Sequence, residues 1–589
     1  MNVQIAPVGA RFDDLTGGTA LSFGPPRRVL TADSPADVVP LLAEVERATA
    51  EGCWAVGYLA YEAAAGLDPR WAVAARSAAD QLPLAVFALC DRPADVPPVA
   101  PPTGRARSYD LGPWQRGWTE DGYRRDVARV REHIAAGNTY QLNLTVRMTA
   151  PVDGDLTELY ADLAWAQHGS HAAYLDLGRF VVVSASPELF FEWRPDLLVT
   201  RPMKGTAPRG RTTAEDADRR DRLLESEKER AENLMIVDLL RNDLGQIADT
   251  GSVEAASLFT PERFGTVWQL TSEVTARPRP GTGLVDVFRA LFPSGSVTGA
   301  PKHRTMELIR ELERRPRGVY CGAVGVVAPP GHPYRARFNV AIRTVTVDRA
   351  TGTAEFGTGG GITWGSDAGA EHAELLAKTA ILAEPFEDFA LLETMAYVPD
   401  RGVRNLGRHL VRLADSAAYF GFAFDRPTVE AQVAAAVASA SGARVRLVLG
   451  RSGSVDVAVT ALPEPTRDPV RLVVDPEPVG GESVWLRHKT TRRDVYTERR
   501  ARHPDADDVV LINQRGQVTE TTIANVAAHL DGRWWTPPLT AGCLPGIERG
   551  RLAETGRLRE RDLTPADLRR ADDLAVVSSL RGWRAAVLS

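Results

Sequence analysis

The sequence lacks the hydrophobic runs, targeting segment and charge bias that would place a protein at a membrane or on nucleic acid. No apolar stretch approaches the roughly 18–20 residues of a membrane-spanning helix. Residues 1–14 have neither the basic nor the apolar region of a signal peptide. The formal net charge of −6 offers no basic surface for nucleic acid or anionic lipid. We therefore expect a cytoplasmic protein with no nucleic-acid or membrane partner.

Cysteine and lysine are both scarce, and the two shortages have different meanings. Four scattered cysteines provide neither a disulfide framework nor a paired metal site. Of 70 basic residues only five are lysines, and arginine can neither act as an amine nucleophile nor form a Schiff base. The few lysines are therefore candidates for amine chemistry, and their sequence contexts must decide. They are Lys204, Lys228, Lys302, Lys378 and Lys489.

The chain of 589 residues is too long for one compact core, since domains commonly hold about 100–200 residues. Up to residue 385, strand-like alternation is mixed with helical patterns, which predict helices over residues 118–138 and 216–243. Near Pro385 the pattern restarts with a strand, a turn and an amphipathic helix. We therefore predict two α/β domains, 1–385 and 386–589.

The first group of candidate residues surrounds Lys204 in the segment RPMKGTAPRG. Gly205 leaves space beside the lysine, and Glu188 follows a proline at the edge of two predicted strands. The glycines of GTGGGI, Gly359–Gly361, would let backbone amides approach an anion, although they lack the GxGxxG spacing of a dinucleotide site. Singly these signals are weak, because helical glutamates are usually solvated and glycine-rich turns are usually structural. The remaining candidates are Glu232, Glu374 and Arg343, which could make a bidentate carboxylate contact.

Taken together and in order, these segments resemble the chorismate-utilising family over residues 1–385. The resemblance implies a large α/β sandwich of antiparallel sheets with helices outside. It also implies that Mg²⁺ coordinates the ring carboxylate of chorismate, so that a nucleophile can displace the C4 hydroxyl. The matching segments are YQLNLT, SASPELF, PMKGTAPRG, RAENLMIVDLLRNDLG, FGTVWQLTSEV, PSGSVTGAPKHRTMELI, YCGAVGV, FNVAIRT and GGGITWGSDAGAEHAELLAK.

Three positions place the resemblance within that family. Lys204 stands where anthranilate synthases carry alanine, and a lysine there is typical of aminodeoxychorismate synthases. Gln141 stands where isochorismate and salicylate synthases use a water-activating lysine, and Gln269 replaces a histidine of many anthranilate synthases. The resemblance implies amination of chorismate to 4-amino-4-deoxychorismate. No G-x-C-x-G-x-Q motif surrounds any cysteine, so we expect ammonia from a separate glutamine amidotransferase subunit or from free ammonium.

The same resemblance implies a role for each residue of the first group. Lys204 would attack the chorismate ring as a transient covalent nucleophile, and Glu188 would protonate the departing hydroxyl. Glu232 and Glu374 would hold Mg²⁺, which commonly takes one or two carboxylates together with water and substrate oxygens. Substrate contacts or nearby charges are expected from Arg343, Tyr320, Gly359, Gly360, Gly361, Lys378, Gln269 and Lys302, and a surface ion pair from Lys228.

After residue 386 the chain resembles the fold-type-IV pyridoxal-phosphate family, which includes branched-chain and D-amino-acid aminotransferases and aminodeoxychorismate lyase. Lys489 is the only lysine there, so it alone can form the Schiff base with pyridoxal 5′-phosphate (PLP). Glu520 would keep the pyridine nitrogen protonated, and Arg412 would pair with the cofactor phosphate. The matching segments are LLETMAY, RHLVRLADSA, WLRHKTTRRDVY, DDVVLINQRGQVTETTIANVAAHLDGRWWTPPL and CLPGIERGRL.

One segment of this second domain departs from the family pattern. Backbone amides around Gly546, Ile547 and Glu548 would complete the phosphate site. Glu548 replaces a threonine whose hydroxyl often binds phosphate, so its carboxylate is expected to point away and only its backbone role is retained. Tyr496 is expected near the phenolic oxygen of the cofactor.

The two halves suggest one pathway. The first would make 4-amino-4-deoxychorismate, and the second would eliminate pyruvate from it to leave 4-aminobenzoate, the folate precursor. Two alternatives remain at this point. The second domain could be an aminotransferase of the branched-chain or D-amino-acid type, or one half could be a silent scaffold or ligand-sensing module.

Overall fold

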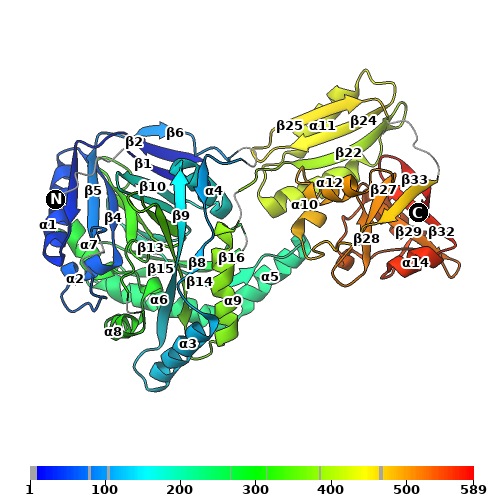
Figure 1. Ribbon diagram of the computed structural model, residues 1–589. Coiled ribbons are helices and arrows are strands. Elements are labelled where there is room, and N and C mark those ends of the chain that lie inside the picture. Colours follow the sequence, from blue (N-terminus) through cyan, green and yellow to red (C-terminus); the bar gives the residue numbers. More distant parts are fainter. Residues whose placement is uncertain are drawn as a thin grey trace. The chain divides into compact units, whose positions relative to one another are not determined.

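A computed structural model describes residues 9–76, 81–102, 106–265, 267–313, 315–383, 386–462 and 469–589. The chain divides into two compact units (Figure 1). The first comprises Met1–Pro208 and Arg220–Asp388, and the second comprises Arg209–Arg219 and Phe389–Ser589. The expected boundary after residue 385 falls on residues outside the described ranges. The sequence did not predict that residues 209–219 belong to the second unit.

The first unit is built on two large antiparallel sheets, as the resemblance implied. Trp54 and Tyr58 of one sheet and Leu175 and Val182 of the other fill a core between them. In the described residues the first sheet contains β17 (Gly299–Ala300), β9 (Gln141–Gly154), β21 (Thr353–Ile362), β20 (Thr344–Asp348), β11 (Phe180–Ser186), β10 (His171–Leu177), β1 (Gly9–Asp14), β2 (Thr19–Phe23) and β6 (Ala94–Val96), with β7 (Tyr109–Leu111) and β8 (Gln115–Arg116) paired to β9. The second contains β14 (Met203–Pro208), β16 (Val267–Ala276), β13 (Leu198–Arg201), β12 (Leu189–Trp193), β19 (Ala336–Val340), β18 (Ala323–Val327), β4 (Trp54–Leu59), β5 (Ala85–Cys90) and β3 (Arg28–Ala32), with β15 (Glu254–Arg263) paired to β16.

Helices cover the outer faces of both sheets, so that the layers run helix, sheet, sheet, helix. Val38, Ile236 and Phe288 pack against the second sheet, while Leu159 and Leu163 pack against the first. This arrangement confirms the α/β sandwich that the resemblance implied. The helices are α1 (Pro35–Ala50), α2 (Ala64–Leu67), α3 (Glu120–Ala135), α4 (Leu156–Gln167), α6 (Glu227–Gly245), α7 (Leu284–Leu291), α8 (Lys302–Glu313) and α9 (Ala368–Thr379).

The single helix predicted over residues 216–243 is two helices, α5 (Thr213–Glu225) and α6. Ser226 interrupts them with extended backbone angles, and its Oγ accepts a hydrogen bond from the backbone N–H of Glu229. A serine at this position caps a new helix rather than continuing the old one, because its short side chain satisfies an otherwise free N–H group. The periodicity of the sequence is continuous across the break, so periodicity alone could not locate it.

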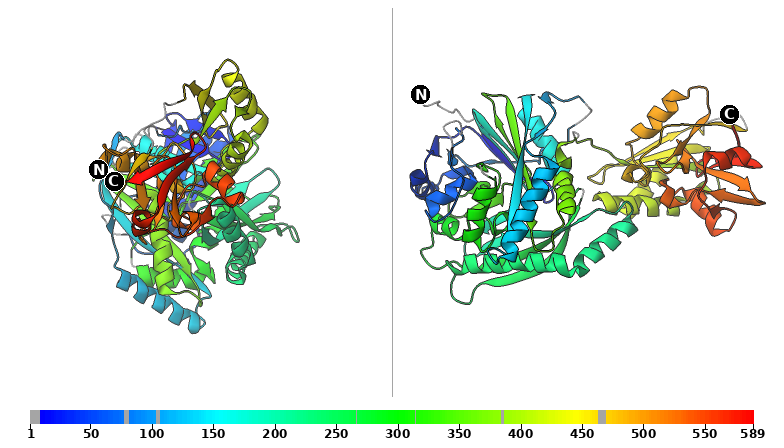
Figure 2. Two further views of the ribbon diagram at one scale, coloured as in Figure 1. Left: turned by 90° about the vertical axis from the view of Figure 1, so that its right-hand side faces the viewer. Right: turned by 60° about the horizontal axis from the view of Figure 1, so that its bottom comes forward.

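The second unit has two sheets, which appear in yellow and in orange to red in Figure 2. Among the described residues one is antiparallel and contains β23 (Gly402–Val403), β22 (Leu391–Val398), β24 (Ala443–Leu449) and β25 (Val455–Thr460). The other is mixed and contains β28 (Val518–Thr521), β27 (Asp508–Ile512), β26 (Val470–Val474), β33 (Gly582–Leu588), β32 (Asp573–Ser578), β29 (Asn525–Leu530), β30 (Arg533–Thr536) and β31 (Arg559–Glu560). The helices, besides the first part of α5, are α10 (Leu406–Phe420), α11 (Arg426–Val437), α12 (Asp494–Arg502), α13 (Ile547–Glu554) and α14 (Pro565–Arg570). No helix of either unit, within the described residues, is long and apolar enough to cross a membrane.

Candidate active sites

The backbone of Lys204 is anchored between a strand and a helix. Lys204 lies on β14, and its carbonyl oxygen accepts a hydrogen bond of 3.2 Å from the side-chain amide of Asn233 on α6. The same amide nitrogen donates to the carbonyl of Leu270 at 3.1 Å, while the Ser272 hydroxyl donates to the amide oxygen at 2.6 Å. Because Asn233 is buried and fully engaged, the strand that carries Lys204 is fixed against α6.

Glycines on β21, a strand of the other sheet, make room for the amine of Lys204. A Cβ atom at Gly361 would lie 2.8 Å from Lys204 Nζ and 2.6 Å from the amide nitrogen of Gln141. A Cβ atom at Gly357 would lie 2.3 Å from the ring of Tyr320. Burial lowers the pKa of Lys204, and a neutral amine is the nucleophilic form. The glycine-rich strand therefore shapes a pocket around a lysine that loses its proton more readily than an exposed lysine does.

Glu188 is a buried carboxyl group facing the same cavity. Burial raises its pKa to about 7, against the opposing effects of a hydrogen bond from Ser296 and the charge of Lys204. A carboxyl group in this state can hold a proton near neutral pH and release it to a leaving group.

Four glutamates on two helices face the cavity. Glu229 and Glu232 are three residues apart on α6, and Glu371 and Glu374 are three residues apart on α9, so each pair shares one helix face. Burial, with repulsion from Glu232 and Glu374 respectively, raises the pKa values of Glu229 and Glu371. Sequence reasoning missed these two, although the same three-residue spacing could have indicated them. Within the described residues no three His, Cys, Asp or Glu side chains are arranged to hold a metal ion.

Two lysines neutralise the predicted metal ligands. Lys378 Nζ lies 2.7 Å from Glu374 Oε1 and donates to the Gly359 carbonyl at 2.9 Å. Lys228 Nζ lies 3.9 Å from Glu232 Oε1, and both residues line the cavity, so the ion pair that was expected at the surface lies at the cavity. Lys302, expected near the site, instead forms a buried ion pair of 2.6 Å with Asp243 and does not line the cavity.

Arg343 adds a basic side chain to the wall of the cavity. Its backbone φ of +51° lies in the left-handed region, which is uncommon for a residue with a side chain and is often found at functional sites. Its guanidinium donates to the Lys378 carbonyl at 2.7 Å, and burial lowers its pKa to about 10. The cavity of about 140 Å³ is lined by the predicted residues Glu188, Lys204, Glu232, Gln269, Tyr320, Arg343, Gly359, Gly360, Gly361, Glu374 and Lys378.

The second unit contains its own cavity, of about 400 Å³, with Lys489 in its wall. Burial and then the charges of Arg412 and Arg493 lower the pKa of Lys489 to about 8. Burial raises the pKa of Glu520 to about 7, and its carboxylate accepts a hydrogen bond of 2.8 Å from the Tyr496 hydroxyl. A lysine amine, a carboxyl group and a cavity of this size match what an aldehyde cofactor with a ring nitrogen needs.

Of the predicted phosphate-binding residues, Arg412, Gly546 and Ile547 line this cavity, whereas Glu548 does not. Gly546 and Ile547 lie at the start of α13. The Glu548 side chain is paired with Arg404 at 3.2 Å and Arg551 at 2.7 Å. Arg412 also lines the cavity, but its Nε and Nη2 donate to Glu393 at 2.8 and 2.6 Å, and its Nη1 donates to the Pro545 carbonyl at 3.0 Å. Arg412 is thus held in place by a buried carboxylate that the sequence interpretation had given no role.

A model of the family described as chorismate binding enzyme matches residues 19–384, well over half of the chain. The chain belongs to the chorismate binding enzyme family. A second model, described as amino-transferase class IV, matches residues 390–587. The first match contains the Lys204 cavity and the second contains the Lys489 cavity.

Relatives in this family carry two different activities in their names. The chain is 43% identical over 284 residues to an aminodeoxychorismate synthase of Streptomyces griseus, covering 48% of this chain and 38% of the relative. It is 39% identical over 265 residues to aminodeoxychorismate synthase component 1 of Klebsiella aerogenes, covering 45% and 58%. It is also 41% identical over 267 residues to anthranilate synthase component 1 of Streptomyces coelicolor, covering 45% and 51%. The matches thus span between about two fifths and three fifths of these relatives.

A solved structure of the family supports the fold of the first unit. Anthranilate synthase component I from Streptococcus pneumoniae superposes with a TM-score of 0.51 at 24% sequence identity, covering 64% of this chain and 91% of that protein. At this identity the likeness concerns the fold alone.

Proposed function

We propose that the chain is a bifunctional enzyme that aminates chorismate to 4-amino-4-deoxychorismate and then converts this product to 4-aminobenzoate and pyruvate. The observation that carries the proposal is the presence of a buried lysine with a lowered pKa in each of two cavities, each beside a carboxyl group with a pKa raised to about 7. A lysine and a carboxyl group whose pKa values are both shifted toward neutrality are typical of acid–base and nucleophilic sites. Such pairs argue against a silent scaffold.

In the first cavity, the nitrogen of Lys204 would bond to the chorismate ring while the C4–O bond breaks. Glu188 would give its proton to the departing hydroxyl, which leaves as water. Ammonia would then bond to C4 and release the lysine amine, so that chorismate and ammonia yield 4-amino-4-deoxychorismate and water. Arg343 would bind a substrate carboxylate.

Mg²⁺ fits the donor set of the first cavity. It prefers carboxylate, water and substrate oxygens and often uses only one or two protein carboxylates, which Glu232 and Glu374 would supply. Bound there, it would polarise the substrate carboxylate as a Lewis acid. A divalent cation bound there would also relieve the repulsion that Glu232 exerts on Glu229 and that Glu374 exerts on Glu371.

PLP fits the second cavity, where it would supply an electron sink. Lys489 would hold the cofactor and move the proton at C4 of the substrate, while Glu520 would be hydrogen-bonded to the ring nitrogen.

The charge of the second cavity bears on the choice between lyase and aminotransferase. Besides Arg412, four arginines line the cavity, Arg444, Arg446, Arg493 and Arg581, whereas Glu520 is the single acidic side chain among its described lining residues. 4-Amino-4-deoxychorismate carries two carboxylates, whereas a branched-chain amino acid carries one and an apolar chain. The charge of the pocket therefore favours the lyase over an aminotransferase of the branched-chain type.

The supply of ammonia tests this proposal. Chorismate, Mg²⁺, PLP and ammonium should yield 4-aminobenzoate with the chain alone, detected by mass spectrometry, because each cavity holds its candidate lysine. Glutamine in place of ammonium should yield none, since no glutaminase motif is present and relatives are named as a component 1. Omitting Mg²⁺ should stop the amination. Turnover with glutamine and the chain alone would contradict the partner proposal, and no product with ammonium would contradict the function.

The space that Gly361 leaves should be essential. Gly361→Ala should lower the amination rate by roughly 10²-fold, the scale of a misplacement of about 1 Å in a reacting group, because the new Cβ would sit 2.8 Å from Lys204 Nζ. Gly365→Ala is the control, since Gly365 follows β21 closely in the chain but does not line the cavity, and its Cβ would meet no atom within 4 Å. Equal rates for the two variants in a steady-state assay with ammonium would show that Lys204 does not need this space.

Glu188 should control the alkaline side of the amination pH profile. At a fixed concentration of free ammonia, the rate should fall as the pH rises through about 7, the pKa of Glu188, because only the protonated carboxyl can supply the leaving hydroxyl with a proton. Glu188→Gln, which cannot ionise, should lose roughly 10²–10⁴-fold in rate and lose this alkaline fall. A ratio of the wild-type rate to the Glu188→Gln rate that does not fall between pH 7 and 9, at a fixed concentration of free ammonia, would contradict the assignment.

A further inference from the structure

Residues 209–219 come from within the chorismate binding match but pack as part of the second unit. In sequence they follow directly on β14, the strand of Lys204, and they include the start of α5. The rest of the second unit begins only at Phe389. The segment is therefore a piece of the class IV unit that the second family match does not contain.

The segment is held in a tight turn. Asp216 Oδ1 accepts hydrogen bonds from the Gly210 N–H at 2.8 Å and from Arg209 Nε at 2.7 Å, and the Arg209–Asp216 ion pair is almost fully buried. A Cβ atom on Gly210 would lie only 2.1 Å from the backbone nitrogen of Asp216. Only glycine allows the chain to approach the start of α5 so closely.

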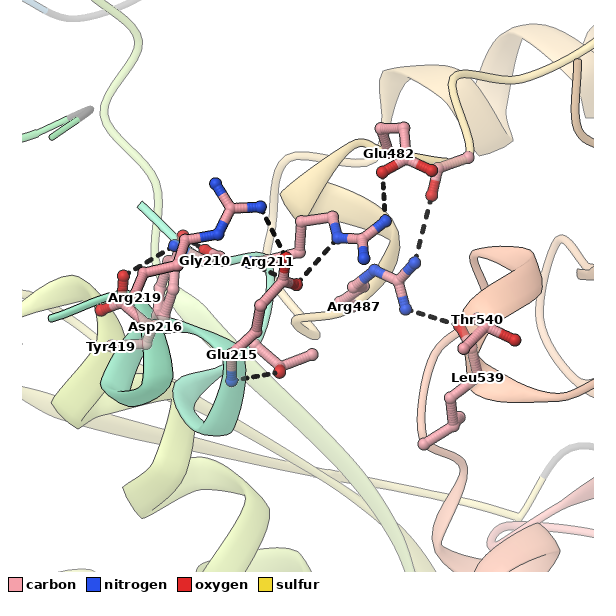
Figure 3. Close-up of polar contacts among 12 residues, drawn as sticks. Gly210, Arg211, Glu215, Asp216, Arg219, Tyr419, Glu482, Arg487, Leu539 and Thr540 are labelled. Atoms are coloured by element: carbon pink, nitrogen blue, oxygen red, sulfur yellow. Dashed lines mark hydrogen bonds and ion pairs between the residues drawn. The ribbon is translucent and has the colours of Figure 1, made fainter. Parts of the chain in front are cut away.

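This turn contacts Tyr419, which lies near the C-terminal end of α10 (Figure 3). The Tyr419 hydroxyl donates to the Gly210 carbonyl at 2.6 Å. Arg209 donates to the Tyr419 carbonyl at 2.9 Å, and its guanidinium carbon lies 4.4 Å from the centre of the tyrosine ring. A second contact follows one residue later, where Arg211 is paired with Glu482.

Tyr419 in turn supports the residue before Lys489. Its ring stacks on that of His488, with centres 4.5 Å apart and planes inclined by 29°. The imidazole Nδ1 of His488 is 2.9 Å from the Ser416 hydroxyl, and burial lowers the pKa of His488 to about 4, so the ring is neutral. On the other side, the Lys489 carbonyl accepts from the Leu392 N–H at 2.9 Å. The backbone that presents Lys489 is thus clamped between β22 and the stack of His488, Tyr419 and the 209–219 turn.

We propose that residues 209–219 are a positioning element of the second active site, which fixes Lys489 through Tyr419 and His488. This rests on the proposed function in one respect, that Lys489 binds PLP. The class IV unit is then not self-sufficient: a segment that precedes it in the chain by about 170 residues sets how firmly its lysine is held. Tyr419 and Gly210 touch neither cavity, and they act only through His488.

The test uses the full chain and three variants. Tyr419→Phe removes the hydroxyl that bonds to Gly210 and keeps the stacked ring, whereas Gly210→Ala displaces the turn itself. Tyr58→Phe is the control, because this buried tyrosine of the first unit likewise donates to a carbonyl, that of Pro83 at 3.0 Å. Two readouts are taken: the dissociation constant of PLP, from the visible absorbance of the bound cofactor, and the kcat and KM for 4-amino-4-deoxychorismate.

Tyr419→Phe should raise the dissociation constant of PLP about three- to tenfold, which corresponds to the net free energy of one buried hydrogen bond. It should lower kcat of the second step while KM stays unchanged, because the substrate contacts are intact. Gly210→Ala should have the larger effect, and Tyr58→Phe should have none on either quantity. If the wild-type protein binds PLP and Tyr419→Phe and Gly210→Ala bind it equally well, the positioning role is wrong, whereas the proposed function stands. If wild type forms no visible band, the proposed function fails with it.

Discussion

Lys204→Ala should lower the formation of 4-amino-4-deoxychorismate by roughly 10³-fold or more, the scale on which loss of a catalytic nucleophile is felt. The amine is buried beside Glu188 in a cavity shaped by Gly361, and alanine supplies no atom that can bond to the ring. Without the covalent route, ammonia should attack the other ring carbon and give an anthranilate-type intermediate. Product identification by mass spectrometry after incubation with chorismate, Mg²⁺ and ammonium measures both effects.

The matched control for this prediction is Lys204→Arg. It keeps a positive charge in the cavity but has no free amine, because the guanidinium stays protonated. If charge alone matters, the arginine variant should recover much of the rate. If nucleophilic attack matters, both variants should be equally impaired, while PLP binding in the second unit stays unchanged. Full formation of 4-amino-4-deoxychorismate by Lys204→Ala would contradict the role of Lys204.

Lys489→Ala should abolish the release of 4-aminobenzoate and leave the amination active. The visible absorbance of the bound cofactor should disappear, because no other primary amine exists after residue 386. The first cavity is complete without this lysine, so 4-amino-4-deoxychorismate should accumulate at the wild-type rate. Absorbance spectra and a time course of products measure the two effects.

Leu392→Ala, in the same cavity wall as Lys489, is a control for disturbance of the pocket without loss of the amine. It should retain the visible band. A Lys489→Ala protein that still releases 4-aminobenzoate at the wild-type rate would contradict the role of Lys489, whereas loss of amination as well would show that the two sites are not chemically separate.

Sequence reasoning grouped the candidate residues of the first cavity better than it identified the partners of the candidates. Lys204, Glu188 and Gly361 are far apart in the chain, yet the ordered motifs allowed them to be grouped, and the fold brings them to one cavity. The pairing of Arg412 with Glu393 could not be derived, because a strand and a helix must first be packed before two side chains can be known to meet. The roles assigned to these residues remain predictions.

Two features of the fold could not be predicted from the sequence pattern, and each has a physical reason. The break at Ser226 is a local competition between a side-chain cap and a continuing helix, which periodicity does not register. The membership of residues 209–219 in the second unit depends on tertiary contacts such as that of Tyr419 with Gly210. Their sequence reads simply as the continuation of the Lys204 motif into a helix.

The ratio of pyruvate to 4-aminobenzoate tests the central claim most directly. Wild-type protein is given chorismate, ammonium and Mg²⁺, with PLP and without any 2-oxo acid, and both products are quantified by mass spectrometry. The account predicts equal amounts of the two, because cleavage of 4-amino-4-deoxychorismate releases one of each. Accumulation of 4-amino-4-deoxychorismate with no pyruvate, combined with transfer of an amino group to added 2-oxoglutarate, would contradict it.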